Sequence, residues 1–590
     1  MCGILVAFAK KGTLDENSCS KASKKIFSRG PDFNFSRYKL NGKLFLSQTV
    51  LSVTGNPQNN LHYTTSKTGK YEILFNGEIY NFKDLHKNIL NGRGHANISK
   101  TDTETLVNLH EECDSSKVFE SLKGMFAYVL FDSQKNILTI ARDIVGEKVL
   151  YQYEDESIFI VSSQIGPILE LAKDIRIDKD ILKEYFFTRH LITREKTVYK
   201  NLTTILPGSL KTIDLNEFKI KLQKRYTFSD WFNSDELKKN IEKSSDNLLN
   251  NMNNVFAENA KTISPQINYF SVLSGGVDSS LVSKYLYENS DLKPNLICLQ
   301  FPNKDAIASE INNFNKFFTG SIHTKMVTED LFKDFIKDSY QSICMPLPTH
   351  SFISQAILAK EVNNLGSKVL LTGDGGDELF GGYEFYKTLK EYHILPEQNP
   401  SIYSGVVDIG INFNNWKAGE LREESQNIWN KTTQLFKDFG PNEATIQSIL
   451  LLDSTVQLES VGIRASDTMS MMSSVESRGF FLSQDIVSLA LHTPGIHKIN
   501  NITPNEENMT RPLLKDLFKK NFGADLLKPK QGFSGFPNES MKKIITDYKV
   551  TQDFLEITNL GDFSIEKNIA LEWKLLNTEY FLREFQSYIK

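Results

Sequence analysis

The sequence predicts an α/β protein with two domains, on three observations. Residues 1 to about 210 form short segments in which apolar and polar residues alternate between turn residues, as in strands and hairpins. Residues 267–373 contain two apolar strand patterns, each of which enters a glycine-rich turn and then a helical pattern. The rest of the chain, to residue 590, is mainly helical in pattern. We therefore expect a β-rich layered domain, then a doubly wound parallel sheet, and a mainly helical C-terminal part.

Length, charge and cysteine content exclude several classes of protein. The 590 residues suffice for more than one core, since single cores stop growing at ~250–300 residues. With 68 basic and 72 acidic residues, the chain lacks the excess positive charge that nucleic acid or anionic lipid attracts. Five cysteines without paired spacing exclude a disulfide scaffold, and no apolar run reaches the ~18 residues of a membrane helix. We expect a cytoplasmic protein with no nucleic-acid or membrane partner.

The order of elements follows from periodicity. The alternation predicts a helix over 103–112 and strands over 43–53, 71–79, 126–132, 137–142 and 157–162. Pro207-Gly208 and one further strand close the first domain. Because residues 229–264 have the pattern of one charged amphipathic helix, we place the domain boundary near its start.

The strongest motif follows a strand predicted over Ile267 to Leu273. It is Ser274-Gly275-Gly276-Val277-Asp278-Ser279-Ser280, ahead of a helix. Such a turn lets backbone amides and a helix N-terminus approach a pyrophosphate, with hydroxyls as further donors. The motif has no Walker lysine, so transfer of a γ-phosphate is not expected. An aspartate in an anion-binding loop requires a cation; the alternative is a purely structural glycine turn.

A second strand, Lys368 to Thr372, enters a similar turn, Gly373-Asp374-Gly375-Gly376-Asp377-Glu378. Asp377 is the best candidate for a second carboxylate. We predict that Asp278, Asp377 and the phosphates hold Mg²⁺, with water completing the octahedron. The alternative is a surface Asp-Gly loop.

Cys2 is a candidate nucleophile, because removal of Met1 would place its thiol beside its own α-amino group. An α-amine with a pKa of ~7.7–8.0 suits a general base near neutral pH. Asn76 and Gly77 could donate hydrogen bonds to an oxyanion. Each feature has a structural alternative: a cysteine is often a small buried hydrophobe, and Asn-Gly is the commonest hairpin dipeptide.

A family resemblance joins these features. Six segments occur in the order of the N-terminal-nucleophile glutaminase domain of glutamine-dependent asparagine synthetases: Met1-Cys2-Gly3-Ile4, Arg29-Gly30-Pro31-Asp32, Asn76 to Asn81, Asp102-Thr103-Glu104, Gly124-Met125-Phe126-Ala127 and Ala141-Arg142-Asp143. The resemblance implies an αββα layered fold over 2–210 and glutamine hydrolysis through a thioester. It implies that Cys2 is the nucleophile, that Asn76 and Gly77 form the oxyanion hole, and that Asp102 binds the substrate's amino group.

The first half departs from the family at one position. The family places an arginine, in His-x-Arg-Leu-Ser, against the glutamine carboxylate, whereas this chain has Gln48-Thr49-Val50-Leu51-Ser52. Val50 cannot replace a guanidinium contact worth ~1.5–3 kcal/mol. Arg29 or another basic residue could compensate. Either glutamine or free ammonia is therefore the nitrogen donor.

The second half resembles the ATP-pyrophosphatase superfamily and the synthetase domain of the same family, over 235–590. The resemblance implies ATP and Mg²⁺ as cofactors and adenylation of a carboxylic acid. It carries over Asp374, at the family's glutamate of the amidation step, and Lys530, in Lys528 to Ser534, as catalytic residues. The implied ATP-binding residues are Leu273, Ser274, Gly275, Gly276, Asp278, Ser279 and Gly373.

The combined expectation is an ATP-dependent amidotransferase in which ammonia travels inside the protein to an acyl-adenylate. Its partners would be glutamine, ATP and a carboxylic acid, with a homodimer as an open option. Aspartate is the default acceptor, but residues 345–351 depart from the family pattern. A uronic acid of a surface polysaccharide or a secondary-metabolite acid is the alternative. Intact Cys2 argues against a β-lactam synthetase, and intact Asp278 and Asp377 argue against a non-catalytic scaffold.

Overall fold

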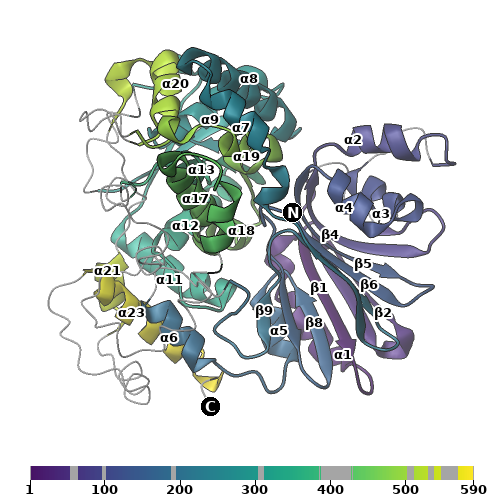
Figure 1. The fold of residues 1–590 in the computed structure, drawn as a ribbon. Helices are drawn as coiled ribbons and strands as arrows, with labels where there is room; N and C mark the ends of the chain where they lie inside the picture. The colour runs from purple at the N-terminus through teal and green to yellow at the C-terminus, as the bar shows by residue number, and fades with distance from the viewer. Residues whose placement is uncertain are drawn as a thin grey trace.

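The chain folds into two parts in the computed structural model (Figure 1). Strands of the first part, purple to blue, lie beside the helices and the parallel sheet of the second part. The N-terminal end of the first strand lies where the two parts meet. The structure describes residues 2–53, 64–95, 101–187, 194–302, 311, 313–384, 386, 427, 429–500, 510–528, 537–545 and 569–588.

Two antiparallel sheets form the first part. The six-stranded sheet has the order β2 (Phe33–Lys39), β3 (Leu44–Val50), β1 (Cys2–Ala9), β8 (Ile158–Ser162), β7 (Tyr151–Glu154), β9 (Leu202–Thr204). The five-stranded sheet has the order β11 (Lys219–Arg225), β10 (Ser209–Asp214), β6 (Ile137–Arg142), β5 (Gly124–Asp132), β4 (Tyr71–Ile79). The second sheet therefore continues beyond residue 210.

The burial of β1 shows how the layers stack. Ile4, Val6 and Phe8 face a core between the two sheets, whereas Leu5 and Ala7 face α1 (Glu16–Lys24) and α5 (Ile165–Leu171). Alternate side chains of a strand point to opposite faces, so a strand covered on both faces is apolar throughout. Helices α3 (Asp102–Glu112) and α4 (Ser115–Ser121) cover the outer face of the five-stranded sheet. The expected αββα layering is confirmed.

The second part contains the predicted parallel sheet. Its order is β14 (His323–Met326), β13 (Asn295–Gln300), β12 (Phe270–Val272), β15 (Val369–Thr372), β16 (Glu476–Gly479). All four neighbouring pairs are parallel. The chain order reverses between β12 and β15, and open α/β sheets bind ligands at such a switch point. The two predicted glycine turns follow these two strands.

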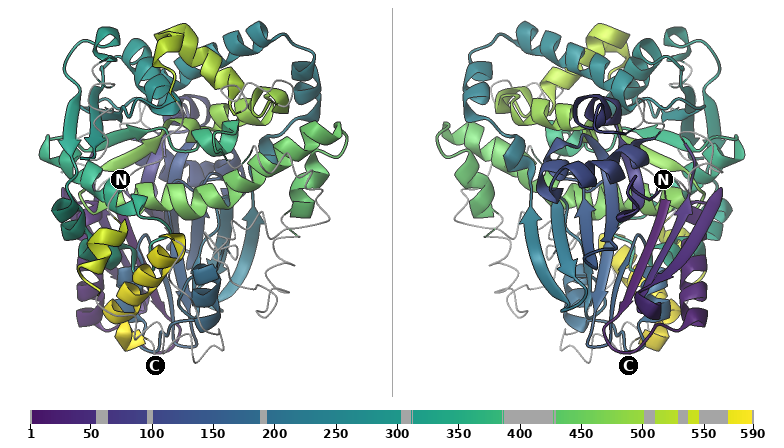
Figure 2. Two further views of the ribbon diagram at one scale, coloured as in Figure 1. Left: turned by 90° about the vertical axis from the view of Figure 1, so that its left-hand side faces the viewer. Right: turned by 90° about the vertical axis from the view of Figure 1, so that its right-hand side faces the viewer.

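Helices surround this sheet, as the mainly helical pattern predicted. The helix α9 (Val277–Asn289) packs on β12, and α12 (Ser351–Asn364) packs on β15. The helix α23 (Ile569–Glu584) packs against α21 (Pro537–Lys542). This pair lies at the opposite end of the second part from α20 (Pro512–Phe522) (Figure 2). Among the described residues, none of these helices combines the length and the apolar character needed to cross a bilayer.

Two predictions of secondary structure were wrong. Residues 229–264 form α7 (Ser234–Ile241) and α8 (Ser245–Ile263) rather than one helix. The break occurs because the Ser244 side chain accepts from Asn247 N and starts a new helix there. The fifth strand, β16, was missed because its residues Glu-Ser-Arg-Gly are polar although fully buried, and polar residues do not give a buried-strand pattern.

Buried ion pairs join the two parts. The Arg29 side chain is fully buried and forms a bidentate pair with Asp467, with both N···O distances 2.9 Å. Arg142 and Arg194 both bind Glu459, each at 3.0 Å. A buried charge is costly unless a partner compensates it, so these pairs fix how the two parts sit against each other.

Asp467→Ala is expected to destabilise the protein strongly, because it leaves the Arg29 guanidinium buried without its carboxylate. We expect the free energy of unfolding, measured by urea denaturation, to fall by about 3–5 kcal/mol. The matched control is Asp485→Ala, since Asp485 pairs with Lys123 across the same boundary at 3.2 Å with both side chains at least half exposed. Loss of that exposed pair should cost about 0–1 kcal/mol; equal losses in the two variants would contradict the prediction.

Candidate active sites

Cys2 lies at the start of β1, opposite Val50 of β3. Its backbone N–H donates to Asn76 Oδ1 at 2.8 Å, and this hydrogen bond crosses from one sheet to the other. Burial raises the pKa of the Cys2 thiol, and a hydrogen bond with the Gln48 side chain offsets part of this rise. The thiol therefore requires a base or a bound substrate to become nucleophilic.

Asn76 and Gly77 lie inside β4, not in a hairpin turn. The Asn76 side chain is fully buried, and within the described residues its Nδ2 has no hydrogen-bond acceptor. Because Oδ1 accepts from Cys2, the amide nitrogen is the end of the side chain that remains to donate. Gly77 has φ +148°, and a Cβ there would lie 2.0 Å from the Met125 carbonyl oxygen. Only glycine permits this close approach of β4 to β5.

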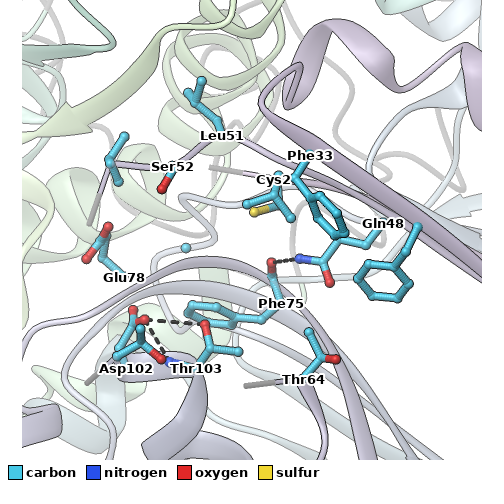
Figure 3. Close-up of a pocket in the computed structure, with 15 residues that line it drawn as sticks. Cys2, Phe33, Gln48, Leu51, Ser52, Thr64, Phe75, Glu78, Asp102 and Thr103 are labelled. Atoms are coloured by element: carbon cyan, nitrogen blue, oxygen red, sulfur yellow. Dashed lines mark hydrogen bonds between the residues drawn. The ribbon is translucent and has the colours of Figure 1, made fainter. Parts of the chain in front are cut away.

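Cys2 and Gly77 line a pocket that is partly open to solvent, with about 590 Å³ of empty space when the adjoining solvent is included (Figure 3). Asn76 is fully buried and is not among the described residues that line it. Glu78 and Asp102 lie at one end of the pocket, and Phe33 and Gln48 at the other, with Cys2 between them. Asp102 is the first residue of α3, and its carboxylate accepts from Ile79 N at 3.1 Å and Thr103 N at 2.7 Å. Burial raises the pKa of Asp102. The pocket thus brings the candidate nucleophile and a carboxylate together, and Asn76 is bonded to the backbone of that nucleophile.

The charged residues among the described lining are Glu78 and Asp102. Burial raises the pKa of Glu78 to about 8, although Arg478 lies 3.3 Å away and lowers it. Val50 lines the pocket where the family has arginine. The lining that the structure describes contains no lysine or arginine, so no described guanidinium faces a substrate carboxylate there.

Arg29 lies outside this lining. Its Nε donates to the Cys2 carbonyl at 3.2 Å, and its two terminal nitrogens bind Asp467. Each of its three nitrogens is therefore bonded either to the backbone of the nucleophile or to the second part of the chain. That geometry positions Cys2 and leaves little of the guanidinium for glutamine.

The first glycine turn of the second part has the form expected of an anion-binding loop. Gly275 has φ +82°, and Gly276 is the N-cap residue of α9, which has no side-chain cap. The Ser274 and Ser279 hydroxyls bond each other at 2.8 Å, while Ser274 and Gly276 are exposed. Leu273, immediately before the turn, is buried and bonded to β13. Uncapped amides at the N-terminus of a helix are open to an anion.

The second turn brings its residues close to the first. A Cβ on Gly373 would lie 3.3 Å from Asp278 Cβ, and one on Gly376 would lie 3.0 Å from the Asp278 carboxylate. Asp374 accepts from Thr372 Oγ1 at 2.7 Å and from Ser466. Burial raises the pKa of Asp374, which favours its protonated form.

Asp278 and Asp377, the two residues predicted as metal ligands, converge on one side chain. Both carboxylates bind one nitrogen, Nη1, of Arg511, with 2.8 Å to Asp377. The two carboxylates supply oxygen ligands of the kind that Mg²⁺ prefers, and the exposed loop amides beside them can donate hydrogen bonds to phosphate oxygens. The residues therefore fit a metal-bound nucleotide. Lys530, the predicted catalytic lysine, lies outside the described residues.

Comparison with known proteins assigns both parts. A family model described as a glutamine amidotransferase domain matches residues 1–227. A model described as asparagine synthase matches residues 264–556. The chain belongs to the asparagine synthetase family. The predicted family is confirmed, and the order of its two domains is the order of the two parts described above.

Members of the asparagine synthetase family are moderately similar in sequence. A Methanocaldococcus jannaschii protein named as an asparagine synthetase (glutamine-hydrolysing) is 29% identical over 65% of this chain and 76% of its own length. A Bacillus subtilis asparagine synthetase is 28% identical over 66% of this chain. The chain spans 64% of that second relative's length.

Among solved structures, the allosteric regulatory enzyme of purine biosynthesis is 12% identical, covers 55% of this chain and 80% of its own, and has a TM-score of 0.30. A Bacillus subtilis glutamine phosphoribosylpyrophosphate amidotransferase is 13% identical with a TM-score of 0.27. The strand order and the layering of the two parts define the fold.

Sequence reasoning missed four residues of these sites: Glu78, Asp467, Arg478 and Arg511. Glu78 lies in the family-like segment Asn76 to Asn81, but the sequence analysis gave it no role. Its position directly after Gly77, a predicted site residue, is the signal that could have identified it. The others lie far along the chain from their partners; Asp467 is separated from Arg29 by 438 positions. No local pattern marks such a pair in a single sequence.

Glu78→Gln is expected to gain stability relative to the unmodified protein as pH rises. Because burial raises the pKa of Glu78 to about 8, the folded protein retains a proton that an unfolded glutamate, with a pKa of about 4.3, releases. The unfolding free energy of the unmodified protein therefore falls between those two pH values, and glutamine removes this fall. Urea denaturation across that pH window measures the difference.

Glu476→Gln is the contrasting variant. Against the effect of burial, Arg478 holds the pKa of Glu476 at about 2, so ionised Glu476 stabilises the fold above the unfolded pKa. Glu476→Gln should therefore lose stability above about pH 4.5. The same sign in both variants would contradict these assignments.

Proposed function

We propose that the protein is an ATP-dependent glutamine amidotransferase of asparagine-synthetase type. The observation that carries this proposal is the pairing of two sites in one chain. One holds Cys2 beside the unpaired donor of Asn76. The other holds two carboxylates beside an anion-binding turn at the switch point of a parallel sheet. The division into a glutaminase domain, predicted over 2–210, and a synthetase domain, predicted over 235–590, is part of the proposal, with β10 and β11 extending the first domain beyond residue 210.

In the proposed glutaminase reaction, removal of Met1 frees the α-amine of Cys2. That amine takes the thiol proton as Sγ attacks the amide carbon of glutamine. The carbonyl oxygen gains the electron pair and is bound by Asn76 Nδ2 and the Gly77 amide. Collapse of this oxyanion expels ammonia, which leaves with the transferred proton, and water then hydrolyses the thioester to glutamate. Asp102 would bind the substrate ammonium group.

In the proposed synthetase reaction, ATP supplies an adenylyl group that activates a carboxylate, with pyrophosphate as the leaving group and Mg²⁺ as counter-charge. The turn at Ser274 to Ser279 binds the phosphates, and Asp278 and Asp377 hold the cation. Asp374, buried against Thr372 and Ser466, is placed to exchange a proton during amide formation. We also propose that the positive charge of Lys530 stabilises the transition state of this reaction.

Aspartate is the proposed acceptor, which would give asparagine, AMP and pyrophosphate. The segment 345–351 nevertheless differs from the family pattern. Leu347 within it is buried and bonded through its N–H and carbonyl to Asn577 of the C-terminal helix. A different carboxylate, such as a uronic acid of a surface polysaccharide or a secondary-metabolite acid, remains the second candidate. Pyrophosphate release across a panel of acids identifies the acceptor; release of phosphate and ADP instead would refute adenylation.

Free ammonia is a second candidate for the nitrogen donor. The observation that favours it is the acidic lining at Cys2, with Val50 in place of the family's arginine. A homodimer is retained as a proposal on the family resemblance alone.

Cys2→Ala should separate the two half-reactions. We expect it to lose pyrophosphate release driven by glutamine while it keeps release driven by ammonium salts, because the thiol serves only the first site. Cys298→Ala, at a buried cysteine of β13, is the matched control and should keep both activities. Equal loss of both activities in Cys2→Ala would refute the two-site assignment, and an unmodified enzyme active only with ammonium would support free ammonia as donor.

Asn76→Asp tests the oxyanion hole. The aspartate keeps an oxygen that accepts from Cys2 N but replaces the Nδ2 donor with a second acceptor. We expect kcat for glutamine hydrolysis to fall by ~10²–10³-fold with a smaller change in KM. Ammonium-driven synthesis should remain, which shows that the variant is folded. An unchanged kcat would remove Asn76 from the mechanism.

A further inference from the structure

Arg511 belongs to none of the sequence motifs described above. It lies between two turns that are far apart in sequence, 233 residues from Asp278 and 134 residues from Asp377. Its Nη1 binds both carboxylates, and its side chain is 5% exposed. A guanidinium therefore stands between the two side chains that we propose as metal ligands.

The surrounding backbone is shaped to this contact. Arg511 itself has φ +43° and ψ +49°, a left-handed conformation that costs a non-glycine residue of order 1 kcal/mol or more. A Cβ on Gly382 would lie 1.9 Å from the Asp377 carboxylate and 2.9 Å from Arg511 Nη1. The glycine thus leaves room for the ion pair. Strained backbone and a required glycine at one contact indicate that the guanidinium is held there by its surroundings.

One donor of this guanidinium is not used by the described residues. Nε of Arg511 is buried, and within the part of the chain that the structure describes it has no acceptor. An unmade hydrogen bond to a buried charged group is costly. A phosphate oxygen beside the turn at Ser274 to Ser279 would satisfy it, since arginine pairs readily with phosphate.

We propose that Arg511 is a nucleotide-binding residue of the synthetase site. It holds Asp278 and Asp377 together through Nη1 and presents Nε to a phosphate of the bound nucleotide. This inference rests on the proposed function, because it assigns a residue to the same ATP site. Arg511 thereby supplies part of the positive charge at the site. The ATP affinity therefore depends less steeply on Mg²⁺ concentration than it would in a site that held the two carboxylates without this arginine.

The test is direct binding of ATP, measured by isothermal titration calorimetry with excess Mg²⁺ and again with EDTA. Arg511→Gln removes the charge and the Nε donor, so it should weaken binding with Mg²⁺ by about tenfold or more. With EDTA, binding should persist in the unmodified protein and be lost in Arg511→Gln. Lys519→Gln is the matched control on the same helix, since Lys519 pairs only with Asp516 in the described structure, at 3.3 Å. Its ATP binding should stay within about twofold of the unmodified protein.

Arg511→Lys covers the case in which Arg511→Gln does not fold. Lysine keeps the charge but lacks the Nε donor, so we expect an unchanged urea unfolding curve with ATP affinity between those of the other two proteins. Binding equal to the unmodified protein in both Arg511 variants would overturn the inference alone. Failure of the unmodified protein to bind ATP at all would instead overturn the proposed function.

Discussion

The position of the nucleophile depends on one buried guanidinium. Arg29 is fully buried, and its donors bind the Cys2 carbonyl on one side and both oxygens of Asp467 on the other. Neither half of the chain could bury this charge alone, because the desolvation cost is compensated only when both partners are present. Docking of the second part and placement of Cys2 are therefore the same event. Any movement of α18 (Arg464–Met471), which carries Asp467, is transmitted to the backbone of the nucleophile.

A second constraint acts from the opposite sheet. The Cys2–Asn76 hydrogen bond links β1 to β4, and the glycine at position 77 brings β4 within contact of β5. Asn76 is consequently fixed with its nitrogen unpaired, so the donor is oriented before any substrate binds. Preorganised donors are effective because no reorganisation accompanies the reaction. The hydrogen bonds from Cys2 N–H to Asn76 and from Arg29 to the Cys2 carbonyl together fix the position of the Cys2 backbone.

How much the sequence could predict depended on the range of each interaction. Alternation along the segments that form β3, β4, β5, β6 and β8 is a local signal, and so are the glycine turns after β12 and β15. These signals indicated the layered first domain and the parallel sheet of the second. Asn76-Gly77 was ambiguous because the same dipeptide favours a hairpin; only pairing of β4 with β5 resolves it. Residues that act through distant partners, such as Asp467, gave no signal. The missed strand β16 is of the same kind, since its buried charges are stabilised by residues of the first part.

Both sites therefore combine local motifs with cations supplied from elsewhere in the chain. Cys2, Asp278 and Asp377 lie in short sequence motifs, and each motif is completed by an arginine from another element. This arrangement has a physical reason: a cluster of carboxylates or a strained turn is stable only once its counter-charge arrives. In consequence, neither motif is expected to take its final geometry in an isolated fragment. The two parts must be folded against each other before the nucleophile is held, and α20 must be in place before the carboxylate pair is.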